Sequence, residues 1–191
     1  MMLEKPVRTA IPGDICVLLE PDEVELELVR TKQKSLQAIF GGHFHSRVHL
    51  TCQRFALPDD QLQSELIHHL RERLMTYPPF TLTAVSLISF YAEFWQSYLL
   101  RWKIRTTEPL HRFRLTVEEA LHKIDITPHY PSNWNPTLVT ALEEISILKT
   151  ERYLAAMNFP YQLFRVRQVV LSKINGVNNF EILETIPLEN Y

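Results

Sequence analysis

Residues 43–52 read HFHSRVHLTC, and their side chains alternate in the manner of an extended β-strand. One face of such a strand carries groups that bind phosphate or move protons, namely His43, His45, Arg47, His49 and Thr51. The opposite face is mostly apolar and carries Phe44, Ser46, Val48, Leu50 and Cys52. The pattern predicts a strand over about residues 47–55 that turns its polar face toward a cleft. A solvated outer face with scattered histidines is the alternative that this stretch alone leaves open.

The composition predicts one domain with its own core. The chain has 191 residues, of which 46% are hydrophobic, and we expect a single bilobal domain over residues 1–191 with an N-terminal arm at 1–13. The formal net charge of −2 excludes a general electrostatic attraction to nucleic acid, so any such contact is local. No run reaches the ~18 apolar residues of a membrane span, so no membrane partner is expected. Cys16 and Cys52 lie in apolar runs, which predicts reduced thiols in a cytoplasmic protein.

The apolar patterns predict alternating strands and helices interrupted by hairpins. Strands are predicted over about residues 15–20, 47–55, 80–91, 96–106, 161–174 and 180–188, and helices over about 23–40, 60–75, 109–123 and 143–157. Residues 137–142 fit either a short strand or the first turn of a helix. Hairpins within this order favour an α+β fold with mainly antiparallel sheets over a doubly wound parallel sheet.

This order, together with the motif His49-Leu50-Thr51, resembles the two-histidine (2H) phosphoesterases, which include 2′-5′ RNA ligase-like proteins and 2′,3′-cyclic nucleotide phosphodiesterases. The resemblance covers about residues 14–188, and its C-terminal part rests on residues 164–171 and 180–188. It implies two lobes around a central cleft, with helices on the outside and one His-x-Thr/Ser motif donated by each lobe. One histidine would act as general base and the other as general acid, while the hydroxyls hold the phosphate oxygens. It implies no cofactor and no metal.

The second motif departs from the family pattern. Where the family often shows Asn-Trp-x-Pro-His-x-Thr-Leu, residues 133–140 read NWNPTLVT. Aligned on Pro136, Thr137 replaces the histidine and Val139 the hydroxyl residue; aligned on the x-x-Thr spacing, Asn135 replaces the histidine. Asn and Thr hydrogen-bond phosphate but do not shuttle a proton near neutral pH. Because a positioned acid or base contributes roughly 10²–10⁴-fold in rate, weak or altered turnover is predicted.

The candidate site follows from these residues and from the resemblance. The catalytic candidates are His49 and Thr51, and the substrate-binding candidates are His45, Arg47, Trp134, Asn135, Thr137, Arg165 and Arg167. The expected ligand is a phosphodiester, such as an RNA end, a 2′,3′-cyclic nucleotide or another small nucleotide. A cyclic phosphodiesterase-like hydrolase using His49 is one hypothesis. A binding module for RNA, nucleotide or protein that has lost turnover is the other.

Further alternatives concern the remaining histidines and the basic residues. His129, His43 or His45 is a possible replacement for the missing proton carrier, and His43, His45 and His49 together are a minor candidate for a metal site. The four glycines form neither a dinucleotide-binding loop nor a P-loop, and no Gly-x-Ser-x-Gly elbow is present. The basic face of residues 96–106, with Arg101, Lys103 and Arg105, is typical of a solvated surface.

Overall fold

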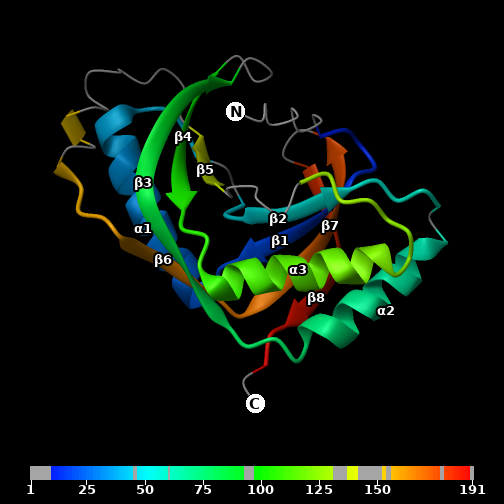
Figure 1. The fold of residues 1–191 in the computed structure, drawn as a ribbon. Coiled ribbons are helices and arrows are strands. Elements are labelled where there is room, and N and C mark those ends of the chain that lie inside the picture. The colour runs from blue at the N-terminus through cyan, green and yellow to red at the C-terminus, as the bar shows by residue number, and fades with distance from the viewer. Residues whose placement is uncertain are drawn as a thin grey trace, which may run out of the picture.

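The computed structural model describes residues 10–44, 47–59, 61–92, 97–130, 137–141, 152–153, 156–176 and 179–189, and of residues 90, 92, 97–98 and 137–141 the backbone alone. The described chain forms two four-stranded antiparallel sheets and three helices (Figure 1). The first sheet has the order β2-β1-β7-β8 and the second the order β5-β4-β3-β6. The predicted α+β class with antiparallel sheets is therefore confirmed.

The described elements follow one another in the predicted order, except that two strands, β6 and β7, replace the one strand predicted over residues 161–174. Their bounds are β1 Ile15–Glu20, α1 Glu23–Phe40, β2 Leu50–Phe55, α2 Leu62–Leu74, β3 Phe80–Ala92, β4 Ser97–Ile104, α3 Glu108–His122, β5 Thr137–Ala141, β6 Tyr161–Val166, β7 Gln168–Gly176 and β8 Asn179–Pro187. Residues 137–141 form a strand, which decides between the two alternatives for that segment. The helix predicted over 143–157 falls mostly outside the described residues.

The strand predicted over residues 161–174 is two strands that belong to different sheets. β6 pairs with β3, whereas β7 pairs with β1 and β8. The break falls at Arg167, the single residue between β6 and β7. The predicted single strand was wrong because the run of β-branched and aromatic residues continues across this position. The residue types of a segment predict that it forms a β-strand, but they do not predict which sheet the strand joins.

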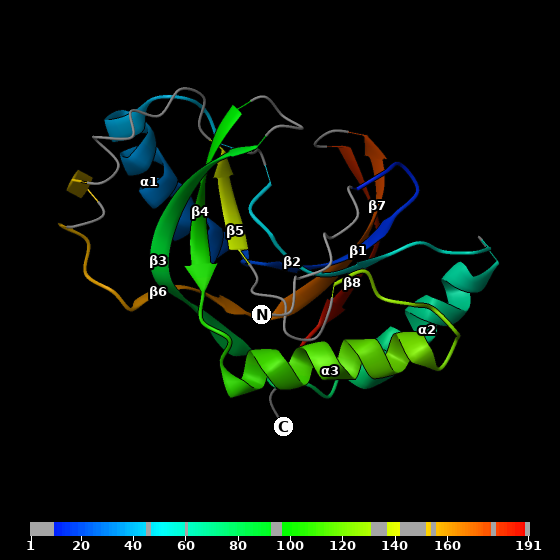
Figure 2. The same ribbon diagram turned by 45° about the horizontal axis from the view of Figure 1, so that its top comes forward.

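The two sheets share one hydrophobic core with the helices. Buried side chains from both sheets and from α3 belong to it, among them Val17, Leu19, Leu82, Leu100, Phe113 and Phe164. Figures 1 and 2 show α2 and α3 side by side at one end of the molecule and α1 beside the second sheet, where it contacts β6. The helices thus lie on the outside, as predicted.

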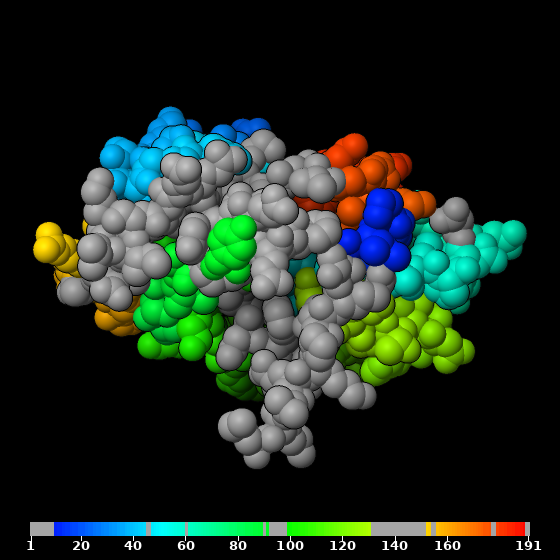
Figure 3. All heavy atoms as spheres, turned by 90° about the horizontal axis from the view of Figure 1, so that it is seen from above, coloured from blue at the N-terminus to red at the C-terminus, as the bar shows by residue number. Residues whose placement is uncertain are grey.

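Residues 10–14 attach to the first sheet. The backbone N–H of Gly13 donates to the carbonyl of Ile174 at 2.8 Å, and the N–H of Ile174 donates to the carbonyl of Asp14 at 2.9 Å. Figure 3 shows this segment, in blue, against the orange atoms of the C-terminal strands. Gly13 has φ = 94°, a conformation that favours glycine, and this turn leads the chain into β1.

Both ends of α1 are set by the residues that the sequence places there. Asp22 caps the N-terminus by accepting a hydrogen bond from the backbone N–H of Glu25 at 2.9 Å. Gly41, with φ = 77°, ends the helix. Arg167 donates to the Asp22 carboxylate, so the crossing point between the sheets is tied to the start of this helix.

We expect this cap to make stability depend on pH. The backbone hydrogen bond from Glu25, and then Arg167, hold the pKa of Asp22 below its usual range. Because the pKa of the Asp22 carboxyl is lower in the folded protein, its stabilising effect is fully present above the pKa of an Asp in the unfolded chain, near 3.9. The effect is lost as the pH falls through the pKa of Asp22 in the folded protein. Asp22→Ala is expected to cost about 1 kcal/mol of unfolding free energy at neutral pH. Urea unfolding at neutral and acidic pH should show the wild type and Asp22→Asn converging in acid, since Asn keeps the cap without the charge. A difference independent of pH would contradict this account.

Candidate functional site

The segment bearing the first motif presents polar groups on one side only. The strand β2 begins at Leu50, later than predicted, so His49 immediately precedes it. The side chains of His49 and Thr51 are partly exposed, while Val48, Leu50 and Cys52 are buried in the core. The alternation predicted for residues 48–52 is therefore confirmed.

Phe180 forms one wall beside His49. The two rings meet edge-on, with their centroids 5.3 Å apart and their planes at 68°. Phe180 lies in β8, the far strand of the same sheet, so its ring reaches the imidazole across the face of the sheet. This contact limits the orientations open to the His49 ring.

A β-bulge at Cys52 brings one further residue onto the face of the motif. Thr51 pairs with Leu18, but Gln53 pairs with Val17, so Cys52 is the extra residue. Beyond the bulge the alternation is inverted, and Arg54 pairs with Cys16. Cys16 and Leu18 belong to a hydrophobic cluster separate from the main core, on the same face of β1. Arg54 therefore joins Thr51 on this face, whereas strict alternation would place it on the opposite one.

Arg54 is the centre of a buried polar cluster. Its Nε lies 3.6 Å from the carboxylate of Asp14, and its guanidinium carbon lies 5.3 Å from the ring centroid of Tyr130. The side-chain amide of Gln53 fixes Tyr130 by donating to its carbonyl at 3.0 Å and accepting from its N–H at 2.9 Å. Burial raises the pKa of the Tyr130 phenol, while Arg54 and Arg101 oppose the shift. The phenol therefore stays neutral near pH 7 and is a hydrogen-bond donor.

Arg101 extends this cluster to the second sheet. It lies on β4, and its partly buried guanidinium has a pKa lowered by burial, which the nearby Tyr130 opposes. Tyr130 thus lies close to guanidinium groups from both sheets. Of the predicted solvated basic face, Lys103 and Arg105 are exposed, but Arg101 is not. The sequence missed Arg54 and Arg101, because their burial depends on the bulge and on the approach of the two sheets.

The described part of the second motif, residues 137–140, lies in β5, which contacts β2. Residues of β5 lie within 8 Å of residues of β2 (Cα–Cα), and Figure 2 shows the two strands meeting between the sheets. The backbone of Thr137 pairs with Lys103 and that of Val139 with Arg101. Val139, the residue that the alignment on Pro136 places at the family's second hydroxyl position, is therefore the cross-strand neighbour of Arg101. Trp134 and Asn135 lie outside the described residues, as does the side chain of Thr137.

The other sequence-predicted residues lie in different places. Arg47 is close to His49 but binds Glu20 through two hydrogen bonds, one of them Nη2–Oε2 at 3.0 Å. Arg167 binds Asp22 at the start of α1, and Arg165 is exposed on β6, the strand of the second sheet furthest from β5. His45 lies outside the described residues.

Of the two described histidines proposed as replacements, His129 is fixed at a distance from His49. His43 is exposed just after α1. The backbone N–H of His129 donates to the carbonyl of Arg54 at 2.8 Å. Arg54 follows His49 by five positions, which span about 17 Å in extended chain. His129 is therefore anchored at the far end of β2.

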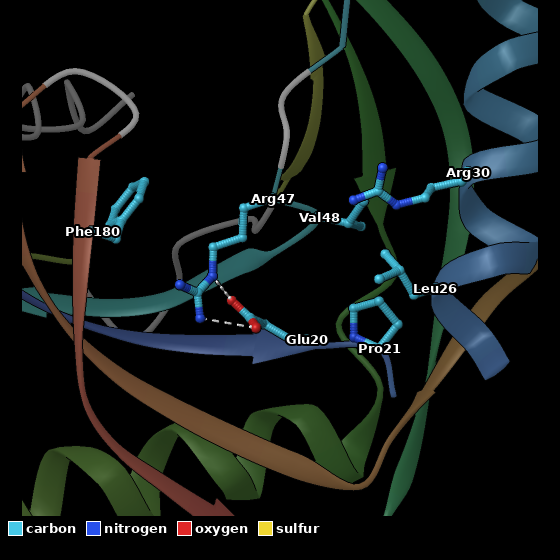
Figure 4. Close-up of a pocket in the computed structure, with 7 residues that line it drawn as sticks. All are labelled: Glu20, Pro21, Leu26, Arg30, Arg47, Val48 and Phe180. Carbon is cyan, nitrogen blue, oxygen red and sulfur yellow. Dashed lines mark hydrogen bonds and ion pairs between the residues drawn. The ribbon is translucent and has the colours of Figure 1, made fainter. Parts of the chain in front are cut away.

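A cavity of about 380 Å³ opens beside the motif (Figure 4). Pro21, Leu26 and Val48 give it apolar walls, and Phe180 links it to His49. Its charged groups are Glu20, Arg30 and Arg47. Figure 4 shows Arg30 projecting from α1 toward Val48, while Arg47 turns toward Glu20.

Three other features bear on the chemistry. Within the described ranges, no three His, Cys, Asp or Glu side chains gather as a metal site, and no helix is long and apolar enough to cross a membrane. Cys16 and Cys52 are free and buried, as predicted, and burial raises the pKa of both thiols to about 12. Such thiols are poor nucleophiles near neutral pH.

No family model matches the sequence, and no curated protein matches it either. Solved structures match its fold over nearly the whole chain. A phosphoesterase has a TM-score of 0.62 and 13% identity, with 94% of this chain and 100% of that chain covered. Escherichia coli LigT in complex with 3′-AMP has a TM-score of 0.60 and 14% identity, with 94% and 100% covered. Kluyveromyces marxianus Usb1 with uridine monophosphate has a TM-score of 0.55 and 13% identity, with 92% and 99% covered. The chain therefore shares its overall fold with these structures.

Proposed function

We propose that the protein binds a phosphodiester, such as an RNA end or a 2′,3′-cyclic nucleotide, between β2 and β5 and hydrolyses it weakly. The observation that carries this proposal is that His49, just before β2, and Thr51, within it, are both partly exposed between buried neighbours, on a strand that contacts β5. Structures of the same fold hold related ligands, since LigT was crystallised with 3′-AMP and with phosphate, and Usb1 with uridine monophosphate.

The chemistry assigns one proton transfer to this chain and leaves the other to solvent. Hydrolysis of a 2′,3′-cyclic phosphate adds water to phosphorus and breaks one P–O bond to the ribose. The attacking water loses a proton, and the leaving ribose oxygen gains one. His49 performs one of these transfers, and the Thr51 hydroxyl donates a hydrogen bond to a phosphate oxygen. Without a second histidine the other transfer depends on bulk water, which is why slow turnover is expected.

The charges between the sheets support retained binding. Arg54 and Arg101 approach Tyr130 from the two sheets, and Arg101 is the cross-strand neighbour of Val139. A phosphate held by Thr51 would meet the Arg101 guanidinium on the side where the family places a second hydroxyl. Guanidinium groups bind phosphate strongly but do not exchange protons near neutral pH. This combination also fits the second hypothesis, a binding module with no turnover.

His49→Ala separates these possibilities. We expect slow hydrolysis of 2′,3′-cyclic AMP by the wild type and a rate about tenfold lower in the variant. The expected loss of rate is modest because two catalytic groups that act together have non-additive effects. In this chain the second histidine of the pair is already absent, so removal of His49 costs less than it would in a complete pair. Binding of 3′-AMP, measured by calorimetry, should weaken in parallel. His111→Ala, which removes an exposed histidine of α3, is the matched control.

Each other outcome has a defined meaning. Equal hydrolysis by the wild type and His49→Ala would remove His49 from catalysis. Binding of 3′-AMP by the wild type without hydrolysis would establish the binding module. Absence of both binding and hydrolysis would overturn the proposed function.

A further inference from the structure

The cavity beside His49 contains charged groups that the proposed function does not use. We propose that it holds a second phosphate of the ligand, so that the protein prefers a nucleotide carrying two phosphates on one sugar to a nucleotide carrying one. This inference rests on the proposed function for the position of the first phosphate, at His49 and Thr51. It assigns the second phosphate to Arg30 and Arg47.

The spacing of the two positions suits a single sugar. Arg47 precedes His49 by two residues, and two residues of extended chain span at most about 7 Å. Phe180 is common to both positions, because its ring contacts His49 and also lines the cavity. The volume of about 380 Å³ lies at the lower end of the range for small-ligand sites, roughly 300–1,000 Å³. It therefore suits a phosphate with part of a sugar better than a longer oligonucleotide.

The charges in the cavity favour an anion. Arg47 uses two N–H groups on Glu20, and a guanidinium has five. Its other N–H groups remain able to donate to a ligand without breaking this pair. Arg30 projects from α1 into the lining of the same cavity (Figure 4), so the lining carries two guanidinium groups and one carboxylate. The forked N–H donors of a guanidinium match the oxygens of a phosphate, and such charge-assisted hydrogen bonds are stronger than neutral ones.

The apolar walls strengthen this attraction. Pro21, Leu26 and Val48 lower the local dielectric constant beside the charged groups, so the attraction of an anion to Arg30 exceeds its value at an open surface. Glu20 acts in the opposite direction, because its carboxylate repels an entering phosphate while it orients Arg47. The cavity should therefore favour a dianionic phosphate, which has the charge to compete with Glu20, over a weaker anion.

The test compares two probes at one ionic strength. Calorimetry with adenosine 3′,5′-bisphosphate and with 3′-AMP should show the wild type binding the bisphosphate about tenfold or more tightly, the size expected for a charge-assisted hydrogen bond. Arg30→Gln should bring the ratio of the two affinities close to one, and Arg30→Lys should retain part of it. Glu20→Gln should raise the ratio a few-fold by removing the repulsion. Arg73→Gln, at an exposed arginine of α2, is the charge-matched control and should leave the ratio unchanged.

The outcomes distinguish this inference from the proposed function. Equal affinity of the wild type for both probes, or a ratio unaffected by Arg30→Gln, would overturn the inference and leave the proposed function standing. A ratio lowered equally by Arg73→Gln would also overturn it, because the preference would then reflect overall charge. Failure of the wild type to bind both probes would overturn the inference, and together with absence of hydrolysis of 2′,3′-cyclic AMP it would refute the proposed function itself.

Discussion

The double variant Thr137→His/Val139→Thr should hydrolyse 2′,3′-cyclic AMP roughly 10²–10⁴-fold faster than the wild type. These substitutions restore a second His-x-Thr motif on β5, which lies against the strand of the first motif. Leaving-group protonation and activation of water would then each have an imidazole. In this background His49→Ala should cost the whole gain, whereas in the wild type it costs about tenfold, because only a complete pair behaves as a unit. Steady-state rates of all four proteins measure this coupling.

Two further variants test the alignment of the second motif. Val139→Thr alone adds a hydroxyl without a proton carrier, so little gain is expected. Asn135→His, which keeps Thr137, creates the motif in the other alignment. A gain in Asn135→His and not in the double variant would show that the alignment on Pro136 is wrong. No gain in any of them would contradict a phosphodiester site between β2 and β5.

Arg54→Leu should lower the free energy of unfolding by about 3–5 kcal/mol. Asp14, whose side chain is only 1% exposed, would lose the guanidinium that lies 3.6 Å from it. The variant also removes the cation beside the Tyr130 ring. Removal of one partner leaves a buried charge unpaired, which lowers the free energy of unfolding strongly. Removal of both partners lowers it by less than the sum of the two single effects. The variant Arg54→Leu/Asp14→Asn should therefore be more stable than the two single effects predict.

Urea unfolding, followed by circular dichroism, gives the four free energies of this double-mutant cycle. Arg105→Leu is the control, since Arg105 is exposed on the same basic stretch as Arg101 and should change stability by about 0.5 kcal/mol or less. Additive effects of the two single substitutions would show that Arg54 and Asp14 do not interact.

The sequence predicted best those features that local signals determine. Strand 15–20 and helix 23–40 have their predicted bounds, because Asp22 and Gly41 define the helix ends. The alternation at the first motif could be predicted because apolar and polar residues alternate along the sequence from residue 48 to residue 52. Burial of both cysteines followed from the same apolar runs.

The features that the sequence did not show depend on contacts between distant segments. The bulge at Cys52 has no local signature, yet it decides that Arg54 shares a face with Thr51. Arg101 resembled its exposed neighbours Lys103 and Arg105, and only the approach of Tyr130 distinguishes it. The Arg47–Glu20 pair joins residues 27 positions apart, so no short motif could indicate the cavity beside it.

The connection at Arg167 restricts how the cleft can move. One residue separates β6 from β7; its carbonyl accepts from the N–H of Leu188 at 2.7 Å, and its side chain holds Asp22. A link so short and so firmly held is a poor hinge. The two sheets should consequently keep a fixed separation. Ligand selectivity should then depend on the size and shape of the ligand more than on a movement of one sheet relative to the other.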